Sequence, residues 1–378
     1  MNEKKYLKIY RLACIEIFQI RFVNLILYNL IILLAITAIF QCVLFVQKFQ
    51  LDYFIQLGPS YFLTLYMLTT LIYVPICKKM APEFVQDLKF GEIHSDSDTV
   101  CKQNEKELAH AVAYMIISFV LAAISGILFT IPSEKDPDIF FIYSLIQQHF
   151  PEWKYLLTWG FKCSVVPLAC ITTMSPAHYL IYGLVHFKLQ ENVLLHNIEN
   201  INGNYDNDEF LDPESQNVIN ERLLSCLKHH IKISRATRTV LRKTKYLVLP
   251  LVLEGCLMFI NIVIHVFTVD EIQSQLWCWQ LLLLTLCSFF TLGGLSAYGQ
   301  KIEDASDDIF YRLVNVKWYN WNQENKKLYL MFLTNTQKPF RLHFSEDVSI
   351  NYRQGVEIGK TFFTFMSVAN QLHKKVNH

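Results

Sequence analysis

Charged residues are scarce in this chain of 378 residues. Asp, Glu, Lys and Arg make up 18% of it, against about 25% in ordinary soluble domains. Hydrophobic residues reach 52% and aromatic residues 14%, so most of the chain needs an apolar solvent. The 34 basic and 33 acidic residues leave a formal net charge of +1. No overall basic field exists to hold a nucleic acid, and that class of partner is excluded.

Metal and redox motifs are also missing. The ten cysteines lack the paired CxxC spacing of zinc or disulfide-exchange sites, so we interpret them as small buried or cytosolic thiols, with Cys163 and Cys278 alone open to oxidation. His178, His186 and His265 lack HExxH spacing, which argues against a metal site. No catalytic constellation or cofactor motif appears, and we expect no enzyme.

Long uncharged runs dominate instead. A helix needs about 20 mostly apolar residues to cross the hydrocarbon, and six runs pass this test, the fifth interrupted by Glu254. The first is too long for the apolar core of a cleaved signal peptide. The six predicted spans are Phe22–Val46, Phe54–Cys77, Ala111–Ile131, Cys163–Phe187, Tyr246–Thr268 and Leu276–Gln300.

A seventh segment, Ile350–Leu372, has a weaker signal. It carries Arg353, Glu357 and Lys360 in its first half and is then uncharged from residue 361 to 372. A pore-lining helix has this mixed character, because one side of it faces water. A cytoplasmic amphipathic helix is the alternative. The three charged residues lie at i, i+3 and i+4 spacings, which favours pairing among themselves.

The positions of Lys and Arg set the orientation. With seven spans, segments 1–21, 78–110, 188–245 and 301–349 share one side and carry 26 of these residues. Positive residues favour the cytoplasm, so we expect a cytoplasmic N-terminus and an external C-terminus. This topology is inverted relative to that of a G-protein-coupled receptor. The other side carries only six: Lys48, Lys135, Lys154, Lys162, Lys374 and Lys375.

Two further features shape the helices. The basic, helically periodic segment Glu221–Lys245 should continue into the fifth span, with Asp212-Pro213 starting the helix. Prolines inside spans remove backbone donors and kink helices. The predicted kinks lie at Pro59 and Pro75 in span 2, Pro167 and Pro176 in span 4 and Pro250 in span 5.

The last third of the chain carries a specific pattern. In order, it contains Gly299, Ser306, Tyr311, Trp318-Tyr319, Lys326-Lys327, Leu330, Lys338-Pro339 and Gln371-Leu372. This order resembles the C-terminal signature of the insect odorant receptors, and length, span number and topology agree with that family along the whole chain.

The resemblance implies an all-α, seven-transmembrane subunit of an odorant-gated, non-selective cation channel. The family assembles as a tetramer, normally with the insect olfactory co-receptor, in the plasma membrane of sensory neuron dendrites. The implied organisation is a cytoplasmic N-terminus (1–21), spans 1 to 6 with their loops (22–300), a cytoplasmic helical anchor (301–349), a pore-lining span (350–372) and an extracellular tail (373–378).

Matching back from Gln371-Leu372 places a hydrophobic gate at Val368 and Leu372, with Gln371 near the narrow point. Residues four apart share a helix face, and a ring of such apolar residues can block ions by dewetting. Ala369 and Asn370 depart from the aliphatic residues common in the co-receptor.

The family binds small volatile ligands in the outer half of the bundle, between spans 2 to 6. Most outer-half positions here are apolar, which suits an ester, alcohol, ketone or terpenoid oriented by Tyr61, Ser125 or Thr173. The candidate ligand-binding residues are Leu57, Tyr61, Leu65, Ala122, Ser125, Leu128, Val166, Cys170, Thr173, Trp277, Leu281 and Leu284.

Glu254 is an isolated carboxyl in the middle of span 5. A carboxyl at that depth needs a partner or water, so either a functional or a hydrogen-bonded structural role is open. The alternatives for the whole chain are a gustatory-type channel that assembles alone, a G-protein-coupled receptor and, third, a transporter or membrane enzyme.

Overall fold

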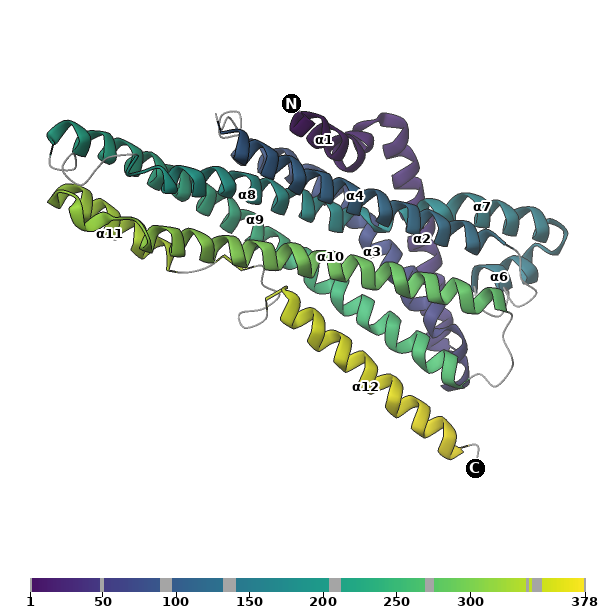
Figure 1. Ribbon diagram of the computed structural model, residues 1–378. Coiled ribbons are helices and arrows are strands. Elements are labelled where there is room, and N and C mark those ends of the chain that lie inside the picture. Colours follow the sequence, from purple (N-terminus) through teal and green to yellow (C-terminus); the bar gives the residue numbers. More distant parts are fainter. Residues whose placement is uncertain are drawn as a thin grey trace.

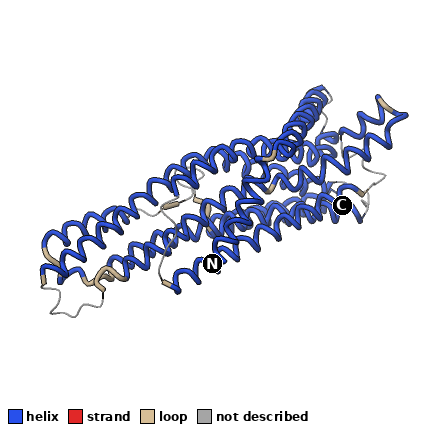
Figure 2. The backbone as a smooth tube through the Cα atoms, turned by 90° about the horizontal axis from the view of Figure 1, so that it is seen from above, coloured by secondary structure: helices blue, strands red, loops and turns tan. Residues whose placement is uncertain are grey.

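Helices form nearly all of the computed structural model, which describes residues 2–47, 51–88, 97–131, 141–203, 212–268, 275–337, 340–341 and 349–376 (Figure 1). Viewed from above, the helices run along one long axis (Figure 2). The first half contains α1 (Asn2–Arg11), the turns η1 (Leu12–Glu16) and η2 (Ile17–Gln19), α2 (Arg21–Gln47), α3 (Leu51–Leu88), α4 (Asp98–Thr130), α6 (Phe141–His149) and η3 (Pro151–Trp153). The second half contains α7 (Lys154–Thr173), α8 (Ser175–Glu199), α9 (Pro213–Thr268), α10 (Gln275–Val314), η5 (Trp318–Asn320), α11 (Gln323–Thr336) and α12 (Tyr352–Val376).

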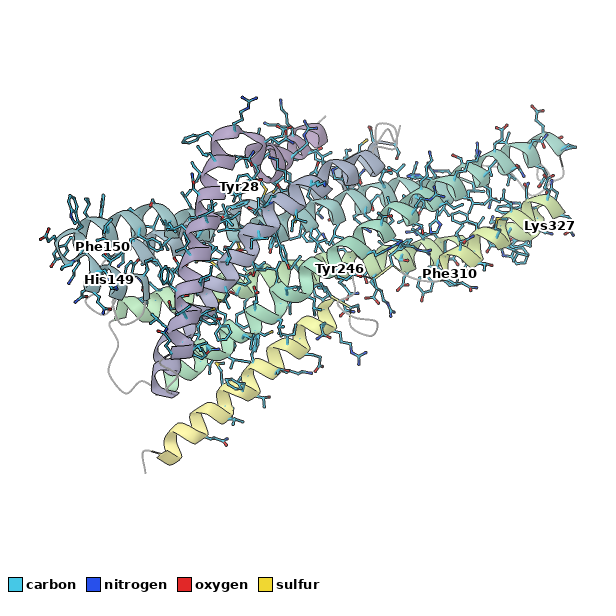
Figure 3. All side chains as sticks on the ribbon, turned by 180° about the vertical axis from the view of Figure 1, so that it is seen from behind. Tyr28, His149, Phe150, Tyr246, Phe310 and Lys327 are labelled. Atoms are coloured by element: carbon cyan, nitrogen blue, oxygen red, sulfur yellow. The ribbon has the colours of Figure 1, made fainter. Side chains whose placement is uncertain are left out.

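The long axis of the molecule has two distinct ends. His149 and Phe150 mark one end, and Lys327 marks the opposite end (Figure 3). We call these the α6 end, built by α6, η3 and the start of α7, and the α11 end, built by α11 and the adjacent parts of α8, α9 and α10. Large apolar side chains project from the outer faces, such as Tyr28 on α2 and Tyr246 on α9, which are 54% and 75% exposed. Such faces suit contact with lipid.

Five helical segments among the described residues are long and apolar enough to span a membrane. They are Arg21–Gln47, Ser60–Lys79, Asp98–Thr130, Pro151–Glu199 and Leu282–Val314, and Leu249–Val263 is a shorter apolar stretch. Each of these six segments overlaps one of the six clean runs of the sequence, with different bounds. The seventh predicted span falls within α12, whose first half is the charged stretch already noted.

Several helices are longer than a membrane is thick. At 1.5 Å per residue, the 56 residues of α9 span about 84 Å, against about 30 Å of hydrocarbon. The helix begins at Pro213 and continues through Glu221–Lys245 into the apolar segment, which confirms the predicted start and continuity. The excess length of α9 and of α10 builds the α11 end.

Span 4 departs from the prediction of one kinked helix. The structure divides it into α7, which ends at Thr173, and α8, which begins at Ser175. Pro176 lies in the first turn of α8, where its missing N–H costs nothing because the first helical donors have no partner within the helix. Pro167 remains inside α7 and Pro250 inside α9.

The centre of the bundle is α8. Its side chains are buried over most of its length, including Ile181, Leu184, Phe187, Leu189 and Leu194. It packs against α3, α4, α9 and α10. The other helices thus pack around α8, which also buries polar side chains such as Gln190 and Asn192.

A buried amide network joins α9 to α11. Asn325 is 0% exposed, and its Nδ2 donates to the carbonyl oxygen of Gln216 at 2.9 Å. Gln216 Oε1 accepts from the backbone N–H of Asn322 at 2.9 Å, and Asn220 donates to Asn325 Oδ1 at 2.7 Å. Buried polar groups of this kind require a defined geometry, so they fix α11 against α9.

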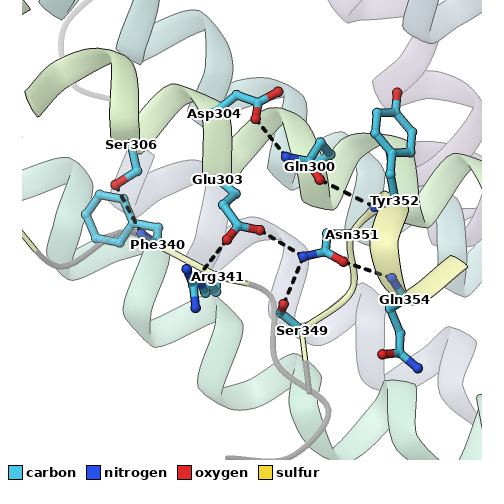
Figure 4. A network of polar contacts seen from close by, with 10 residues as sticks. All are labelled: Gln300, Glu303, Asp304, Ser306, Phe340, Arg341, Ser349, Asn351, Tyr352 and Gln354. Carbon is cyan, nitrogen blue, oxygen red and sulfur yellow. Dashed lines mark hydrogen bonds and ion pairs between the residues drawn. The ribbon is translucent and has the colours of Figure 1, made fainter. Parts of the chain in front are cut away.

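A second polar network joins α10 to the residues that precede α12 (Figure 4). Glu303 on α10 pairs with Arg341 Nε at 2.8 Å and accepts from Asn351 Nδ2 at 3.0 Å. Asn351 Oδ1 in turn accepts from the backbone N–H of Gln354 at 3.0 Å, and thereby caps the start of α12. The Glu303 carboxylate thus holds Arg341 and Asn351, which precede α12, against α10.

Gly299 lets the backbone just before α12 approach α10 closely. A Cβ atom at this position would lie 2.0 Å from the carbonyl oxygen of Ile350. Side chains larger than hydrogen are therefore excluded, which explains a glycine in the middle of a helix despite its cost of roughly 0.5–1 kcal/mol relative to alanine.

His230 lies inside the α11 end. It is 3% exposed, and its ring contacts those of Phe332 and Phe340, with centroids 5.4 and 6.1 Å apart. Burial, with smaller contributions from Arg238 and His229, lowers the pKa of His230 to about 4. The folded protein therefore holds this ring neutral.

We predict that Gly299→Ala destabilises the protein by about 1–3 kcal/mol, because the added methyl group overlaps the Ile350 carbonyl. Gly293→Ala is the matched control on the same helix, since a Cβ there meets nothing within 4 Å. Thermal unfolding of purified full-length protein measures both. Equal stability of the two variants would contradict the close contact.

We also predict a histidine contribution to acid sensitivity. The unfolded chain binds a proton at His230 near the ordinary pKa of about 6.5, whereas the folded chain does so only near 4. The contribution of His230 to the free energy of unfolding is therefore fully present above pH 6.5. That contribution falls by about 2 kcal/mol when the pH is lowered to 5. His230→Phe should remove that part of the pH dependence of thermal unfolding. The exposed His110 provides a control, and a His110→Gln variant should keep the wild-type profile.

Candidate functional site

A small cavity lies toward the α6 end, between α2, α3, α4, α6 and α7. Its volume is about 40 Å³, which exceeds the roughly 10–15 Å³ that one water molecule needs. Most of its wall is apolar. The lining residues are Leu34, Thr37, Gln41, Ser60, Leu63, Thr64, Met67, Phe129, Ile142, Phe161, Val165, Val166 and Ala169.

Two polar side chains in this wall are buried without hydrogen-bond partners among the described residues. Gln41 is 8% exposed and Ser60 4%, and neither Gln41 Oε1 nor Ser60 Oγ has a partner. The threonines of the wall differ. Thr37 Oγ1 donates to the Leu33 carbonyl at 2.9 Å, and Thr64 Oγ1 donates to the Ser60 carbonyl at 2.8 Å. The cavity is therefore an apolar space with two free polar groups.

Of the twelve candidate ligand-binding residues, Val166 lines this cavity. Tyr61 lies against α2, where its hydroxyl is 3.2 Å from Cys42 Sγ and its ring stacks on Phe45 at 6.0 Å. Ala122 packs with Met174 and Cys287 in a separate small cluster. These three side chains thus face different surroundings.

The remaining candidates are spread along α3, α4, α7 and α10. Cys170 lies beside Gly126 on α4, Thr173 donates to the Cys170 carbonyl at 2.7 Å, and Ser125 Oγ is buried without a partner among the described residues. Leu65, Leu128 and Leu284 are half-buried. The side chains of Leu57, Trp277 and Leu281 lie outside the described residues. The twelve-residue pocket stays a prediction.

The contribution of α2 to a cavity was not predicted. The ligand was expected between spans 2 to 6, whereas Leu34, Thr37 and Gln41 belong to span 1. A signal was present, because Gln41 is an amide within the apolar run Phe22–Val46. Polar residues in spans tend to face the bundle interior or water rather than lipid.

Glu254 has a partner in the structure. Thr69 Oγ1 on α3 donates to Glu254 Oε1 at 2.9 Å, whereas Oε2 has no partner among the described residues. The carboxyl thus links α9 to α3, the two helices that pack together most extensively. This contact agrees with the hydrogen-bonded structural role that the sequence left open.

The predicted gate lies on α12. One face of this helix packs on the bundle, where Phe362 stacks on Phe259 with ring centroids 4.1 Å apart. Val368 is 49% exposed, and Gln371 is exposed. The side chain of Leu372 lies outside the described residues. The expected pairing of charges on this helix holds for Lys360 and Glu357, 3.3 Å apart.

The described histidines and cysteines form no metal centre. No group of three His, Cys, Asp or Glu residues among the described residues is placed to hold an ion. His178 instead lies between Tyr10 of α1 and Ser118 of α4, bonding the Tyr10 hydroxyl at 3.3 Å. Nine described cysteines, Cys163 among them, are free thiols, and the side chain of Cys278 lies outside the described part of the chain.

The family model of the 7tm odorant receptors matches residues 59–351. The chain belongs to this odorant receptor family. Membership confirms the family predicted from the C-terminal pattern and supports a receptor rather than an enzyme.

A curated relative and two solved structures agree with this assignment. This odorant receptor is 23% identical over 171 residues to Odorant receptor 67b of Drosophila melanogaster, and the alignment covers 44% of the chain and 39% of that relative. It shares its fold with the insect olfactory receptor OR5 of Machilis hrabei in complex with eugenol, at a TM-score of 0.72 and 13% identity over 98% of this chain and 97% of that one. A second structure of OR5 gives a TM-score of 0.68 at 12% identity over the same shares of the two chains. The predicted all-α, seven-transmembrane bundle is confirmed.

Proposed function

We propose that this receptor is the odorant-binding subunit of a ligand-gated, non-selective cation channel that opens together with the insect olfactory co-receptor. The observation that carries the proposal is the match of residues 59–351 to the odorant receptor family. The shared fold with an olfactory receptor solved in complex with eugenol supports a small volatile organic ligand. The proposed location is the plasma membrane of sensory neuron dendrites.

The proposed ligand site is the outer half of the bundle, at the α6 end. The sequence supports an inverted orientation, because 26 of the Lys and Arg residues fall on the side that carries the α11 end and six fall on the other. The α6 end is then extracellular. Apolar walls with a few polar groups, as in the predicted pocket and in the cavity beside α2, suit a volatile of modest polarity.

The proposed ion path runs along α12. Helical spacing places Glu357, Thr361 and Thr364 on the same face as Val368, eleven, seven and four residues before it. All four side chains are exposed. A polar stripe that ends in an apolar residue suits a hydrated pathway with a hydrophobic gate. In a tetramer, four copies of this face would surround the pore.

Ligand and gate are connected through packing. α12 contacts α9 and α10, and Phe362 of α12 stacks on Phe259 and meets Phe289 edge-on at 6.0 Å. A ligand opens the channel only to the extent that it binds the open arrangement better, about 1.4 kcal/mol for each tenfold shift. Movement of α9 and α10 against α12 is the proposed route for that shift.

We predict odorant-evoked cation current when this chain is co-expressed with the co-receptor, recorded in whole cells with an odorant panel. The response should persist in inside-out patches without GTP, because the pore is part of the complex. Current from the chain alone would favour self-assembly instead. Loss of the response in GTP-free patches would contradict the channel proposal in favour of G-protein signalling.

We further predict that Val368→Ser raises leak current, because a hydroxyl at the constriction favours wetting. Phe363→Ser is the matched control, since Phe363 is exposed on a different face of α12. Whole-cell leak relative to maximal odorant current measures the effect. A Val368→Ser channel as tight as wild type would remove Val368 from the gate.

A further inference from the structure

The cavity beside α2 has a regular construction. Leu34, Thr37 and Gln41 lie at positions i, i+3 and i+7 on one face of α2. Ser60, Thr64 and Met67 repeat the same kind of spacing on α3, so two facing helix stripes form opposite walls. Residues of α4, α6 and α7 complete the lining. This cavity shares Val166 with the predicted pocket between spans 2 to 6 but differs from it in its walls, because α2 supplies one wall and α9 and α10 supply none.

Its polarity is selective. The hydroxyls of Thr37 and Thr64 are already bonded to carbonyls of their own helices, so they present mainly methyl groups. Gln41 Oε1 and Ser60 Oγ have no partner among the described residues and are buried. A buried polar group without a partner is unfavourable. A molecule that forms hydrogen bonds with both Gln41 Oε1 and Ser60 Oγ would therefore gain binding free energy that an apolar molecule does not.

A hydroxyl group satisfies both requirements. It has one hydrogen to donate and two lone pairs to accept. It can donate to Gln41 Oε1, which only accepts, and accept from the Ser60 hydroxyl. An ether oxygen can serve Ser60 alone, and a hydrocarbon serves neither.

Size points to a short group. A volume of about 40 Å³ equals about three times the minimum for one water, which suits a hydroxyl with a few carbons. We infer that the cavity between α2, α3 and α7 binds the hydroxyl end of a small aliphatic alcohol, which donates to Gln41 and accepts from Ser60. This deepens the proposed function, on which it rests for its electrical readout, by naming a ligand class.

Binding is tested first without reference to current. The full-length chain, in complex with the co-receptor in lipid nanodiscs, is titrated with 1-butanol and with its isomer methyl propyl ether, and thermal stabilisation is recorded. The wild type should bind the alcohol roughly three- to tenfold more tightly than the ether, the range of one neutral hydrogen bond. Effects of either compound on the lipid are common to all variants.

Two variants remove the proposed contacts. Gln41→Met should weaken alcohol binding by roughly three- to tenfold and leave ether binding within about twofold. Ser60→Ala should weaken the binding of alcohol and ether alike by roughly three- to tenfold, because both oxygens accept from the Ser60 hydroxyl. Thr37→Val and Thr64→Val are the matched controls in the same wall, because each removes a hydroxyl that is already bonded to a backbone carbonyl. Both controls should keep the wild-type preference for the alcohol.

Equal affinity of the wild type for alcohol and ether would overturn the inference, as would no stabilisation by the alcohol. Equal losses in Gln41→Met and Thr37→Val would also overturn it, because packing rather than hydrogen bonding would then decide. The same ligands are finally applied in co-expression recordings. Alcohol binding without any odorant-evoked current would contradict the proposed function alone, whereas currents from other odorants with no alcohol preference in binding would contradict this inference alone.

Discussion

The absence of water around an apolar helix is the constraint on which this structure depends. Every backbone N–H and C=O group within the hydrocarbon needs an internal partner, and the helix supplies one for each. Several threonine hydroxyls in the spans follow the same rule. Thr37, Thr64, Thr173 and Thr291 each donate to a carbonyl three or four residues earlier in their own helix. Against this background, the buried oxygens of Gln41, Ser60 and Ser125, which have no partner among the described residues, become informative.

The same constraint separates the two ends of the molecule. In the apolar part, packing around α8 holds the helices together, and polar contacts between helices are few and specific, such as Thr69 with Glu254. At the α11 end, amides and ion pairs take over, as around Asn325 and Glu303. Glu303 holds Asn351, the residue that caps the start of α12. A polar end and an apolar bundle therefore meet at the helix proposed to carry the gate.

This fold is retained at very low sequence identity. OR5 of Machilis hrabei shares 13% identity with this chain and nevertheless superimposes over 98% of it, at a TM-score of 0.72. Apolar side chains of similar size exchange at small cost when the pattern and total volume are kept. Positions that line a cavity are free to vary once the bundle is packed. A shared fold therefore does not transfer a ligand, and ligand class has to be argued from side chains such as Gln41 and Ser60.

The sequence by itself determined the number and place of the apolar spans, the continuity of α9 from Pro213 and the family through its C-terminal pattern, because these depend on local hydropathy and residue order. It did not locate the break at Met174, which depends on how α7 and α8 each pack. Nor did it assemble a cavity, since a wall made of Gln41 and Ser60 needs two helices to meet at a given rotation. Helical periodicity shows which residues share a face, whereas only tertiary packing decides what each face meets.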